Sequence, residues 1–407
     1  MESVKPKPKR FKLKLIKSLC AAVVIVGVFG LGLGFGSGRI NIGPAAVFHK
    51  TLNPGLPNKL DYSTIDELYA KLKSDFDGSL DQSKLMDGLG EGLVKAAGDP
   101  YTEYFNSKDA QQFNNDLDGT FTGIGAELSK DAKNNIVVIA PLSGYPADKA
   151  GLKPKDIIAE IDGQNAYDLT VGEAVDKIRG PAGSVVKLKI IRNNRTELNF
   201  SITREKITIP SVETKTLSSG IGYIKISRFG SDTVDLTTKA ANKFKADGVK
   251  GIVVDLRSDP GGLLDAAVGV SSLWLPRGKT ILTERRSDII VKSYLSEGPA
   301  TLAGIPTVVL LNEGSASASE ITAGALKDNG VATLMGVKSF GKGSVQQLEK
   351  LIGGGILKVT IARWYTPDGK NIDKAGITPD KVVKITDDDY KNGRDPQLDA
   401  ATAFLNK

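Results

Sequence analysis

The chain of 407 residues contains 54 Lys and Arg, 47 Asp and Glu, one His and one Cys, and its formal net charge is +7. Its length is sufficient for two or three domains. Residues 1–17 alone hold seven basic side chains against Glu2, so the remainder of the chain is close to neutral. Nucleic-acid binding depends on a broad basic surface, and the composition therefore excludes nucleic acid as an expected partner.

The single histidine and the single cysteine limit the chemistry further. With only His49 and Cys20, the chain can form no Cys/His zinc cluster, no intrachain disulfide and no ordinary Cys-His dyad. A Ser-His-Asp triad would depend on His49, which lies in a segment rich in proline and glycine and is better interpreted as a solvated linker residue. Nucleophilic catalysis by this chain therefore needs a base other than histidine.

The N-terminal segment has the pattern of a membrane anchor. Residues 18–38 contain no charged side chain and are long enough, as a helix, to cross the hydrocarbon core of a bilayer. The basic tail, residues 1–17, precedes this run, so the tail is predicted to be cytoplasmic and the rest of the chain extracytoplasmic. A cleaved signal peptide is the alternative, but no convincing small-x-small cleavage site follows the apolar run before Arg39, and a retained anchor is favoured. We expect a single-pass protein of the cell membrane, of bacterial type.

Five regions follow the anchor. Residues 39–58 carry three prolines and are predicted to be a linker, and residues 59–106 show the spacing of short amphipathic helices suited to packing or oligomerisation. Residues 107–206 are predicted to be β-rich with one helix near 169–179. Residues 207–390 alternate strands and helices, with helices over 232–246 and 318–328, and precede a C-terminal segment, 391–407.

The buried strands of the last large region indicate its fold class. The apolar runs IVVDL and TVVLL are typical of strands that are covered on both faces. The sequence therefore predicts a mixed α/β core, preceded by a smaller β-rich domain.

A glycine-rich turn begins the β-rich region. The turn consists of Phe121, Thr122, Gly123, Ile124 and Gly125. Such a turn can direct backbone N–H groups at a terminal carboxylate while the next strand accepts an extended peptide. Alone it would be an ordinary turn, but three further segments follow it in the order and spacing of a bacterial PDZ domain, which this region resembles: PADKAGL at 146–152, DII at 156–158 and IDG at 161–163.

Arg179 ends the predicted helix of the PDZ-like region. One interpretation is that its guanidinium reaches a bound peptide carboxylate or the neighbouring domain. The other is a solvated cation at a helix C-terminus. The sequence leaves both open.

A serine-rich turn and a lysine loop together suggest nucleophilic catalysis. Ser317 follows a buried strand and precedes a helix, where amide groups and the helix dipole favour an oxyanion. The same segment, through Glu320, also matches a capping box. Lys342 lies between two glycines 25 residues later, and a desolvated lysine can accept the serine proton, with Gln346 orienting it. The alternative for Lys342 is a solvated loop residue.

A third turn, Asp259-Pro-Gly-Gly262, follows the buried strand IVVDL. Its glycines can present N–H groups to a reacting carbonyl, so the amides of Gly262 and Ala318 are candidates for an oxyanion hole. The alternative is a tight turn without a catalytic role.

Two competing motifs overlap the lysine loop. Residues 336–342 match most of a phosphate-binding P-loop, with Asp255 as a candidate magnesium ligand, but Gly343 stands where Ser or Thr must reach the metal. Ser339 and Lys342 also form a Ser-x-x-Lys pattern. That motif requires a helix, which the two neighbouring glycines disfavour.

The combined order of these motifs resembles the C-terminal processing peptidases, also called tail-specific proteases, over about residues 60–385. The resemblance implies a serine endopeptidase on a crotonase-like mixed α/β core with an inserted PDZ domain. It implies Ser317 as nucleophile, Lys342 as base, Gln346 as its orienting partner, and Gly262 with Ala318 as oxyanion hole. No metal or organic cofactor is implied. Asp259 departs from the asparagine common in the family, and its side chain is expected to point away from the hole.

The expected function is thus membrane-anchored proteolysis outside the cytoplasm. Substrates are proteins or peptides with accessible C-termini, held by residues 121–125 and Arg179. A homodimer through the helices near 60–95 and the C-terminal segment is a further expectation. The alternative is a membrane-tethered PDZ adaptor that binds tails without cutting them, against which the intact Ser317 and Lys342 argue.

Overall fold

The computed structural model describes residues 56–57, 59–193, 195–286 and 289–407. The predicted cytoplasmic tail and transmembrane helix, together with His49 and Cys20, lie outside these residues. Among the helices that are described, none combines the length and the apolar character needed to span a bilayer. The chain divides into two compact units, residues 1–80 and 81–407. In the first unit the described helix is α2 (Ser63–Asp75), within the region predicted to be helical.

The second unit begins with two capped helices and a short strand. Helix α3 (Gln82–Lys95) begins after Asp81, whose carboxylate accepts hydrogen bonds from two amides of the first turn. Strand β1 (Glu103–Phe105) follows, and helix α4 (Ser107–Asp118) ends at Gly119, which has a left-handed φ of 61°. Helix α4 occupies a segment that the sequence had suggested would begin the β-rich domain.

The β-rich region forms one antiparallel sheet. Its strands are β3 (Ala126–Lys130), β4 (Ile136–Pro141), β5 (Ile157–Ile161), β7 (Val185–Arg192) and β8 (Thr196–Thr203), in that order, with β6 (Gln164–Asn165) paired to β5. Short helix α5 (Pro146–Lys149) and helix α6 (Val171–Ile178) complete it, and α6 confirms the predicted helix. Strand β3 lies at the edge of the sheet, so one side of its backbone is open for pairing.

Two paired strands connect this region to the rest of the unit. The chain enters through β2 (Thr120–Gly123) and leaves through β9 (Glu205–Thr208), which pair antiparallel. The β-rich domain is therefore inserted into the chain through two paired strands, one entering and one leaving it.

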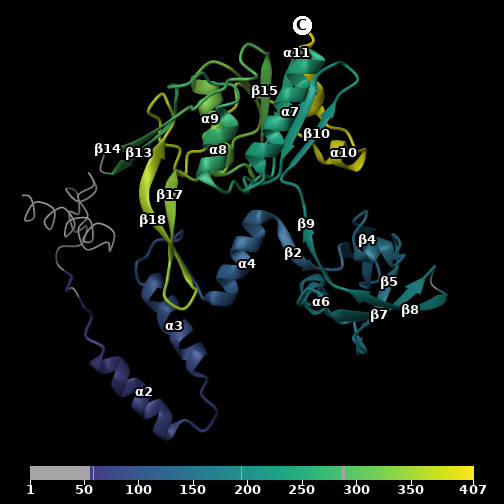
Figure 1. Ribbon diagram of the computed structural model, residues 1–407, viewed down its shortest axis with the longest axis vertical. Coiled ribbons are helices and arrows are strands. Elements are labelled where there is room, and N and C mark those ends of the chain that lie inside the picture. The colour runs from purple at the N-terminus through teal and green to yellow at the C-terminus, as the bar shows by residue number, and fades with distance from the viewer. Residues whose placement is uncertain (1–55, 58, 194, 287–288) are drawn as a thin grey trace, which may run out of the picture. The chain divides into compact units, whose positions relative to one another are not determined.

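The main sheet of the core has six strands and is parallel except at its first pair. Its order is β10 (Val212–Thr216), β11 (Gly222–Ile226), β12 (Ile252–Asp255), β15 (Thr307–Leu311), β16 (Thr333–Gly336) and β19 (Lys381–Val382). One face packs against α7 (Thr233–Asp247), α8 (Leu264–Ser271) and α9 (Ala318–Asp328), which Figure 1 shows side by side. The other face packs against α11 (Pro396–Leu405), which follows α10 (Asp387–Lys391).

These contacts explain the apolar runs in the sequence. Every residue of β12 and of β15 is buried, because helices cover both faces of the central strands. The predicted mixed α/β core is confirmed, and α7 and α9 match the two helices predicted for it within one residue at each end.

A second, antiparallel sheet flanks the core. It contains β13 (Thr280–Arg286), β14 (Ile289–Leu295), β17 (Ser344–Lys350) and β18 (Ile356–Tyr365), and β1 also pairs with β18. Strand β17 follows the lysine loop directly. The site is therefore built from the carboxyl edge of the parallel sheet, where the loops after β12 and β15 meet, and from the start of β17.

Arg257 fastens the C-terminal helix to the central strand. Its guanidinium donates to Asp255 at 2.6 and 2.9 Å and to Asp395 at 2.8 Å, next to the start of α11. Tyr223 also donates to Asp255. Because two partners occupy the buried Asp255 carboxylate, the structure does not support it as a magnesium ligand.

We expect Arg257→Leu to lower the free energy of unfolding of the core by about 3–5 kcal/mol, because the buried Asp255 charge would lose its main partner. Urea denaturation followed by circular dichroism measures the change. The control is Arg394→Leu, which removes an exposed arginine paired with Asp388 and Asp389 and should leave the midpoint unchanged. Equal midpoints for Arg257→Leu and wild type would contradict the assigned role.

Candidate active site

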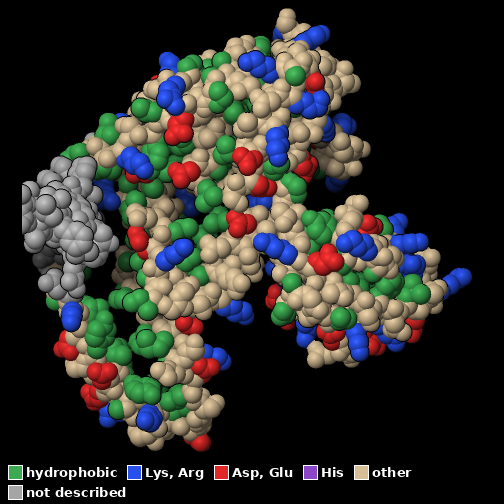
Figure 2. Space-filling view, in the orientation of Figure 1, with side chains coloured by type: hydrophobic (Ala, Val, Ile, Leu, Met, Phe, Trp, Pro, Cys, Tyr) green, Lys and Arg blue, Asp and Glu red, His purple; other side chains and the backbone are tan. Residues whose placement is uncertain are grey.

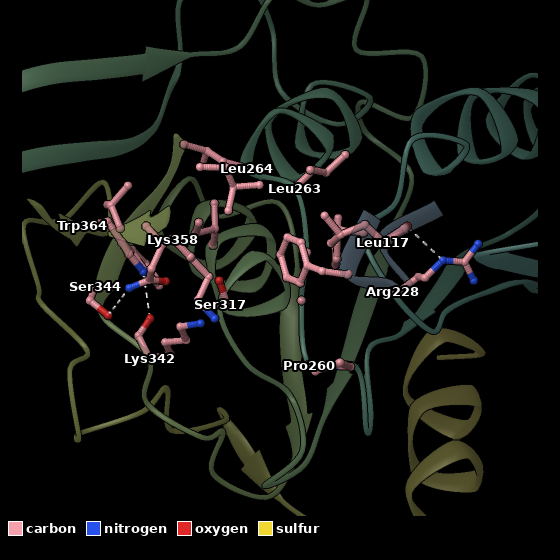
Figure 3. Close-up of a pocket in the computed structure, with 18 of the residues that line it drawn as sticks. Leu117, Arg228, Pro260, Leu263, Leu264, Ser317, Lys342, Ser344, Lys358 and Trp364 are labelled. Atoms are coloured by element: carbon pink, nitrogen blue, oxygen red, sulfur yellow. Dashed lines mark hydrogen bonds between the residues drawn. The ribbon is translucent and has the colours of Figure 1, made fainter. Parts of the chain in front are cut away.

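A cavity of about 380 Å³ brings together most of the predicted catalytic residues. Ser317, Lys342, Gln346 and Gly262 all line it, and Figure 3 shows the Lys342 side chain extending toward Ser317. Ala318 follows Ser317 as the first residue of α9 and is buried behind the cavity wall. The three motifs that the sequence placed far apart therefore converge on one site.

Ser317 lies at a strained turn between β15 and α9. Its φ is 52° and its ψ −112°, a conformation that a residue with a side chain rarely adopts and that costs about 1–3 kcal/mol. The Ser317 amide donates to Glu320 at 2.9 Å, and the Glu320 amide faces the Ser317 hydroxyl oxygen in return, so the predicted capping box is formed. The hydroxyl donates no hydrogen bond to any residue that the structure describes, and Ser317 lines the cavity.

Glu320 joins the serine turn to the lysine loop. This carboxylate is fully buried and accepts four hydrogen bonds. One oxygen accepts from the Ser339 hydroxyl at 2.6 Å and the Gly341 amide at 2.7 Å, and the other accepts from the Ser317 and Lys342 amides, each at 2.9 Å. Burial raises the pKa of Glu320, and these hydrogen bonds oppose that shift. Sequence reasoning identified Glu320 only as a helix cap.

The Lys342 backbone is fixed on both sides, while its amine is unpaired. The carbonyl accepts a hydrogen bond from the Trp364 indole at 2.9 Å, and the amide is held by Glu320. Within the described ranges Nζ makes no hydrogen bond, and it lies 5.3 Å from the ring centroid of Tyr101. Burial, with a smaller contribution from the positive charge of Lys358, lowers the pKa of Lys342. The amine is accordingly easier to deprotonate than that of a solvated lysine.

Gln346 is fixed by neighbours other than the lysine. Its amide nitrogen donates to the Ser344 hydroxyl at 2.8 Å and to the Thr360 hydroxyl at 3.3 Å. These two contacts orient the amide, but no hydrogen bond joins Gln346 to Lys342 in this structure. The orienting role of Gln346 stays a prediction.

The Gly261–Gly262 turn requires glycine at both positions. Gly262 has φ 146°, and a β-carbon there would lie 2.2 Å from the Phe229 carbonyl oxygen. A β-carbon on Gly261 would lie 2.6 Å from the oxygen of Ala316 and 2.8 Å from the nitrogen of Ala318. The turn is therefore packed directly against the segment that contains Ser317. The amides of Gly262 and Ala318 donate no hydrogen bond to another described residue.

Asp259 lies beneath this turn. It does not line the cavity, but it is fully buried, and one carboxylate oxygen accepts the Gly261 amide at 2.8 Å. The second oxygen has no partner among the residues described. Burial raises the pKa of Asp259 to about 7, although the Gly261 and Ser319 hydrogen bonds and the Arg228 charge oppose the shift. The sequence placed this carboxylate near the proposed oxyanion turn and pointing away from the hole, but it did not predict the hydrogen bond with Gly261.

The competing motifs do not have the structures that their chemistry requires. Gly336 ends β16, and the loop after it leads into strand β17 rather than into the helix of a P-loop. Ser339 is buried, donates to Glu320 and accepts the Ile377 amide, so its hydroxyl is already engaged. Residues 339–343 contain no helix.

A second, smaller cavity marks the predicted peptide site. It measures about 100 Å³ and lies between the glycine-rich turn, the edge strand β3 and helix α6. Four of the five turn residues line it, the exception being Thr122. Arg179 also lines it, with its guanidinium 5.1 Å from the Phe121 ring centroid. Arg179 thus lies against the predicted carboxylate-binding turn.

Arg228 was missed by sequence reasoning. Its guanidinium donates to the carbonyls of Asp118 at 3.1 Å and Ile209 at 2.6 Å, beside the two connecting strands, and it also lines the catalytic cavity. No motif in the sequence marks this residue.

Comparisons with known proteins agree with this architecture. Residues 220–383 match the model of peptidase family S41, and residues 116–191 match the PDZ domain. The carboxy-terminal processing protease CtpA of Bacillus subtilis is 35% identical over 343 residues, which cover 84% of this chain and 72% of that protein. A CtpA-like serine protease of Staphylococcus haemolyticus is 36% identical over 347 residues, covering 85% and 69%.

The chain belongs to peptidase family S41. It is a serine peptidase of the carboxy-terminal processing group and carries a PDZ domain, as the sequence resemblance predicted. A solved structure assigned to the S41 proteases, from Bacteroides fragilis, shares the fold, with a TM-score of 0.54 and 18% identity over 86% of this chain and 98% of that one. The crotonase-like grouping of the S41 core stays a prediction.

We expect Asp259→Asn to change how stability depends on pH. The pKa of Asp259 rises from 3.8 to about 7 on folding, so between these values the folded protein keeps a proton that the unfolded chain has lost. The free energy of unfolding of the wild type should fall by up to about 4 kcal/mol as pH rises through this range. The free energy of unfolding of Asp259→Asn should not show this fall, because asparagine cannot ionise. The stability advantage of Asp259→Asn should therefore increase between pH 4 and pH 8.

Denaturant unfolding at several pH values measures this difference. Asp388→Asn, at an exposed carboxylate on α10, is the matched control for loss of a charge. A difference between Asp259→Asn and wild type that stayed constant from pH 4 to pH 8 would show that Asp259 does not titrate in this range.

Proposed function

We propose that this S41 peptidase is a membrane-anchored extracytoplasmic endopeptidase that captures substrate C-termini with its PDZ domain and cleaves peptide bonds with Ser317 and Lys342. The observation that carries the proposal is the shared cavity. Among the residues that the structure describes, its serine hydroxyl donates no hydrogen bond, its lysine amine makes none, and the two neighbouring backbone amides donate none. Each of these groups has a distinct task in peptide hydrolysis.

The proposed reaction proceeds in two steps. The Ser317 hydroxyl attacks the scissile carbonyl carbon while Lys342 Nζ takes its proton, and the amides of Gly262 and Ala318 bind the resulting oxyanion. Collapse of the tetrahedral intermediate breaks the C–N bond, and Lys342 returns the proton to the leaving amine. Water, deprotonated by the same amine, then hydrolyses the acyl-enzyme and releases the serine. No metal ion or organic cofactor takes part in this scheme.

The environment of Lys342 supports its role as base. The lowered pKa increases the fraction of neutral amine near pH 7, which is the form that accepts a proton. The Gln346 amide nitrogen is already bound to Ser344 and Thr360, so its oxygen is the atom that can accept a hydrogen bond from Nζ. Gln346 would thereby hold the amine beside Ser317.

The PDZ site supports recognition of a free C-terminus. The amides of the turn can bind the terminal carboxylate, and an extended peptide can pair with the open edge of β3. Binding in this way raises the effective concentration of the substrate chain at the catalytic cavity. It also favours proteins whose tails are extended and accessible.

Two further parts of the proposal concern assembly. The uncharged run at residues 18–38 is the proposed anchor. Each of the helices α2 and α3 exposes large apolar side chains, which Figure 2 shows as green areas over these helices, and a homodimer would cover them. The exposed side chains are Leu68, Tyr69 and Leu72 on α2, and Met86, Leu89 and Leu93 on α3.

Ser317→Ala and Lys342→Met should each lower kcat/KM on an unfolded protein substrate by at least about a thousandfold, because each variant lacks one partner of the proposed dyad. Time-resolved gel or mass-spectrometric analysis of cleavage measures the loss. Lys338→Met is the control, since it removes an exposed lysine from the same loop.

The same assay separates the peptidase from the adaptor alternative. Both dyad variants should still bind a peptide with an apolar C-terminus, as measured by fluorescence anisotropy. If either variant cleaved at the wild-type rate, the dyad assignment would be wrong. If the wild type bound the tail without cutting it, the adaptor interpretation would replace the proposal.

Amidation of the substrate C-terminus should weaken PDZ binding by about tenfold or more, because the turn amides would lose a charged acceptor. Anisotropy with matched acid and amide peptides measures this ratio in wild type and in Arg179→Ala. A smaller ratio in Arg179→Ala would indicate that Arg179 contributes to carboxylate binding. Equal affinities of the acid and amide peptides in wild type would contradict recognition of the C-terminus.

A further inference from the structure

A third cavity, of about 640 Å³, adjoins the cavity that contains Ser317 and Lys342. Ser344 lines both cavities. Tyr101, whose ring lies beneath the Lys342 amine, lines the 640 Å³ cavity but not the cavity that contains Ser317. A group bound in this 640 Å³ cavity would therefore be close to the proposed base. We call it the basic cavity because of the residues that surround it.

Cations outnumber carboxylates around the basic cavity. Arg285, Arg286, Arg363 and Lys374 line it together with Asp99 and Asp373. Asp373 is paired with Arg363, and Asp99 accepts a hydrogen bond from Thr102. In the described part of the chain, the remaining three cations have no carboxylate partner. The cavity consequently has a net positive charge of its own.

The sheet register places two of these arginines face to face. Arg285 on β13 is directly opposite Arg363 on β18 in an antiparallel pair, so both side chains are on the same face of the sheet. Like charges in this relation destabilise a sheet unless an anion lies between or beside them. Asp373 neutralises only one of the two.

The Arg285 side chain is held in place, but one of its N–H groups lacks a hydrogen-bond acceptor. Its guanidinium lies over the Tyr365 ring, 4.3 Å from the centroid, which fixes its direction. Its Nε is buried and has no hydrogen-bond partner among the residues described. A buried donor without an acceptor costs free energy that a bound oxyanion would recover.

We propose that the basic cavity is a substrate subsite that binds the carboxylate side chain of an aspartate or glutamate near the scissile bond. The proposal rests on the proposed endopeptidase function. Guanidinium groups bind carboxylates through two parallel hydrogen bonds, so Arg285 is the principal ligand and Arg286 and Lys374 add charge. A free anion such as phosphate has the same chemistry, but the proximity of the cavity to Lys342 favours a side chain of the substrate.

The test compares peptides that differ only by Glu or Gln at one position, moved in turn through the four residues on either side of the cleaved bond. The full chain is used, and kcat/KM is measured for each peptide of a pair. We expect wild type to favour glutamate by about tenfold at one position. Arg285→Gln should bring this ratio close to one, Arg285→Lys should restore part of it, and Arg277→Gln, at an exposed arginine outside the cavity, should leave it unchanged.

Other outcomes separate the possible sources of the anion. Wild-type cleavage without a glutamate preference at any position overturns the subsite, as does a preference that survives in Arg285→Gln. Inorganic phosphate should compete more strongly with the preferred glutamate peptide than with its glutamine partner. If phosphate stabilises wild type against heat but inhibits both peptides equally, the cavity binds a free anion and the proposal is wrong.

The subsite can also be tested without cleavage. Peptide binding to the full-length Ser317→Ala chain should show the same glutamate preference, and its absence there overturns the proposal. Failure of wild type to cut any peptide counts against the endopeptidase function, whereas this binding contrast still decides the subsite. If Arg285→Gln does not fold, as judged by circular dichroism, Lys374→Gln replaces it and should reduce the ratio in part.

Discussion

The geometry of the site depends on one buried carboxylate. Glu320 is removed from water, which would be costly for an isolated charge, and it is satisfied by four donors from two separate segments. One of its oxygens accepts the amides of both Ser317 and Lys342, at 2.9 Å each. A single carboxylate oxygen therefore sets the distance between the backbones of Ser317 and Lys342. An apolar residue of similar size could fill the same space, but it could not fix this distance.

The Glu320 carboxylate also links a turn that follows the parallel sheet to a loop that precedes the antiparallel sheet. The parallel sheet supplies the serine turn and the Gly261–Gly262 turn at its carboxyl edge, and these two turns are in direct backbone contact. The antiparallel sheet supplies the lysine loop, whose carbonyl is held by Trp364 on β18. Neither sheet alone supplies both Ser317, the proposed nucleophile, and Lys342, the proposed base. The strain at Ser317 is tolerated because the neighbouring hydrogen bonds define the turn from both sides.

The sequence was sufficient for the main elements of the core and for the choice of the proposed catalytic groups. Buried apolar runs revealed β12 and β15, and glycine-flanked motifs revealed the turns, since both signals are local. It could not reveal the contacts of Glu320 with the lysine loop or of Arg285 with Tyr365, because those join distant segments. Strand β1 was missed for the same reason: its pairing with β18 joins residues more than 250 positions apart. Gln346 shows the opposite case, in which a motif gave the residue but its observed partners are Ser344 and Thr360.

Burial shifts the pKa values of Asp259 and Lys342 in opposite directions and favours the neutral form of each. It lowers the pKa of Lys342, which yields the free amine that a serine nucleophile requires. It raises the pKa of Asp259 to about 7, which keeps the carboxyl beneath the oxyanion turn protonated at lower pH. An ionised Asp259 would repel the oxyanion that the Gly262 amide is proposed to bind. In the proposed mechanism, rising pH would therefore activate Lys342 as base and weaken the oxyanion hole together, so the desolvation that favours the neutral lysine would also limit the pH range of the site.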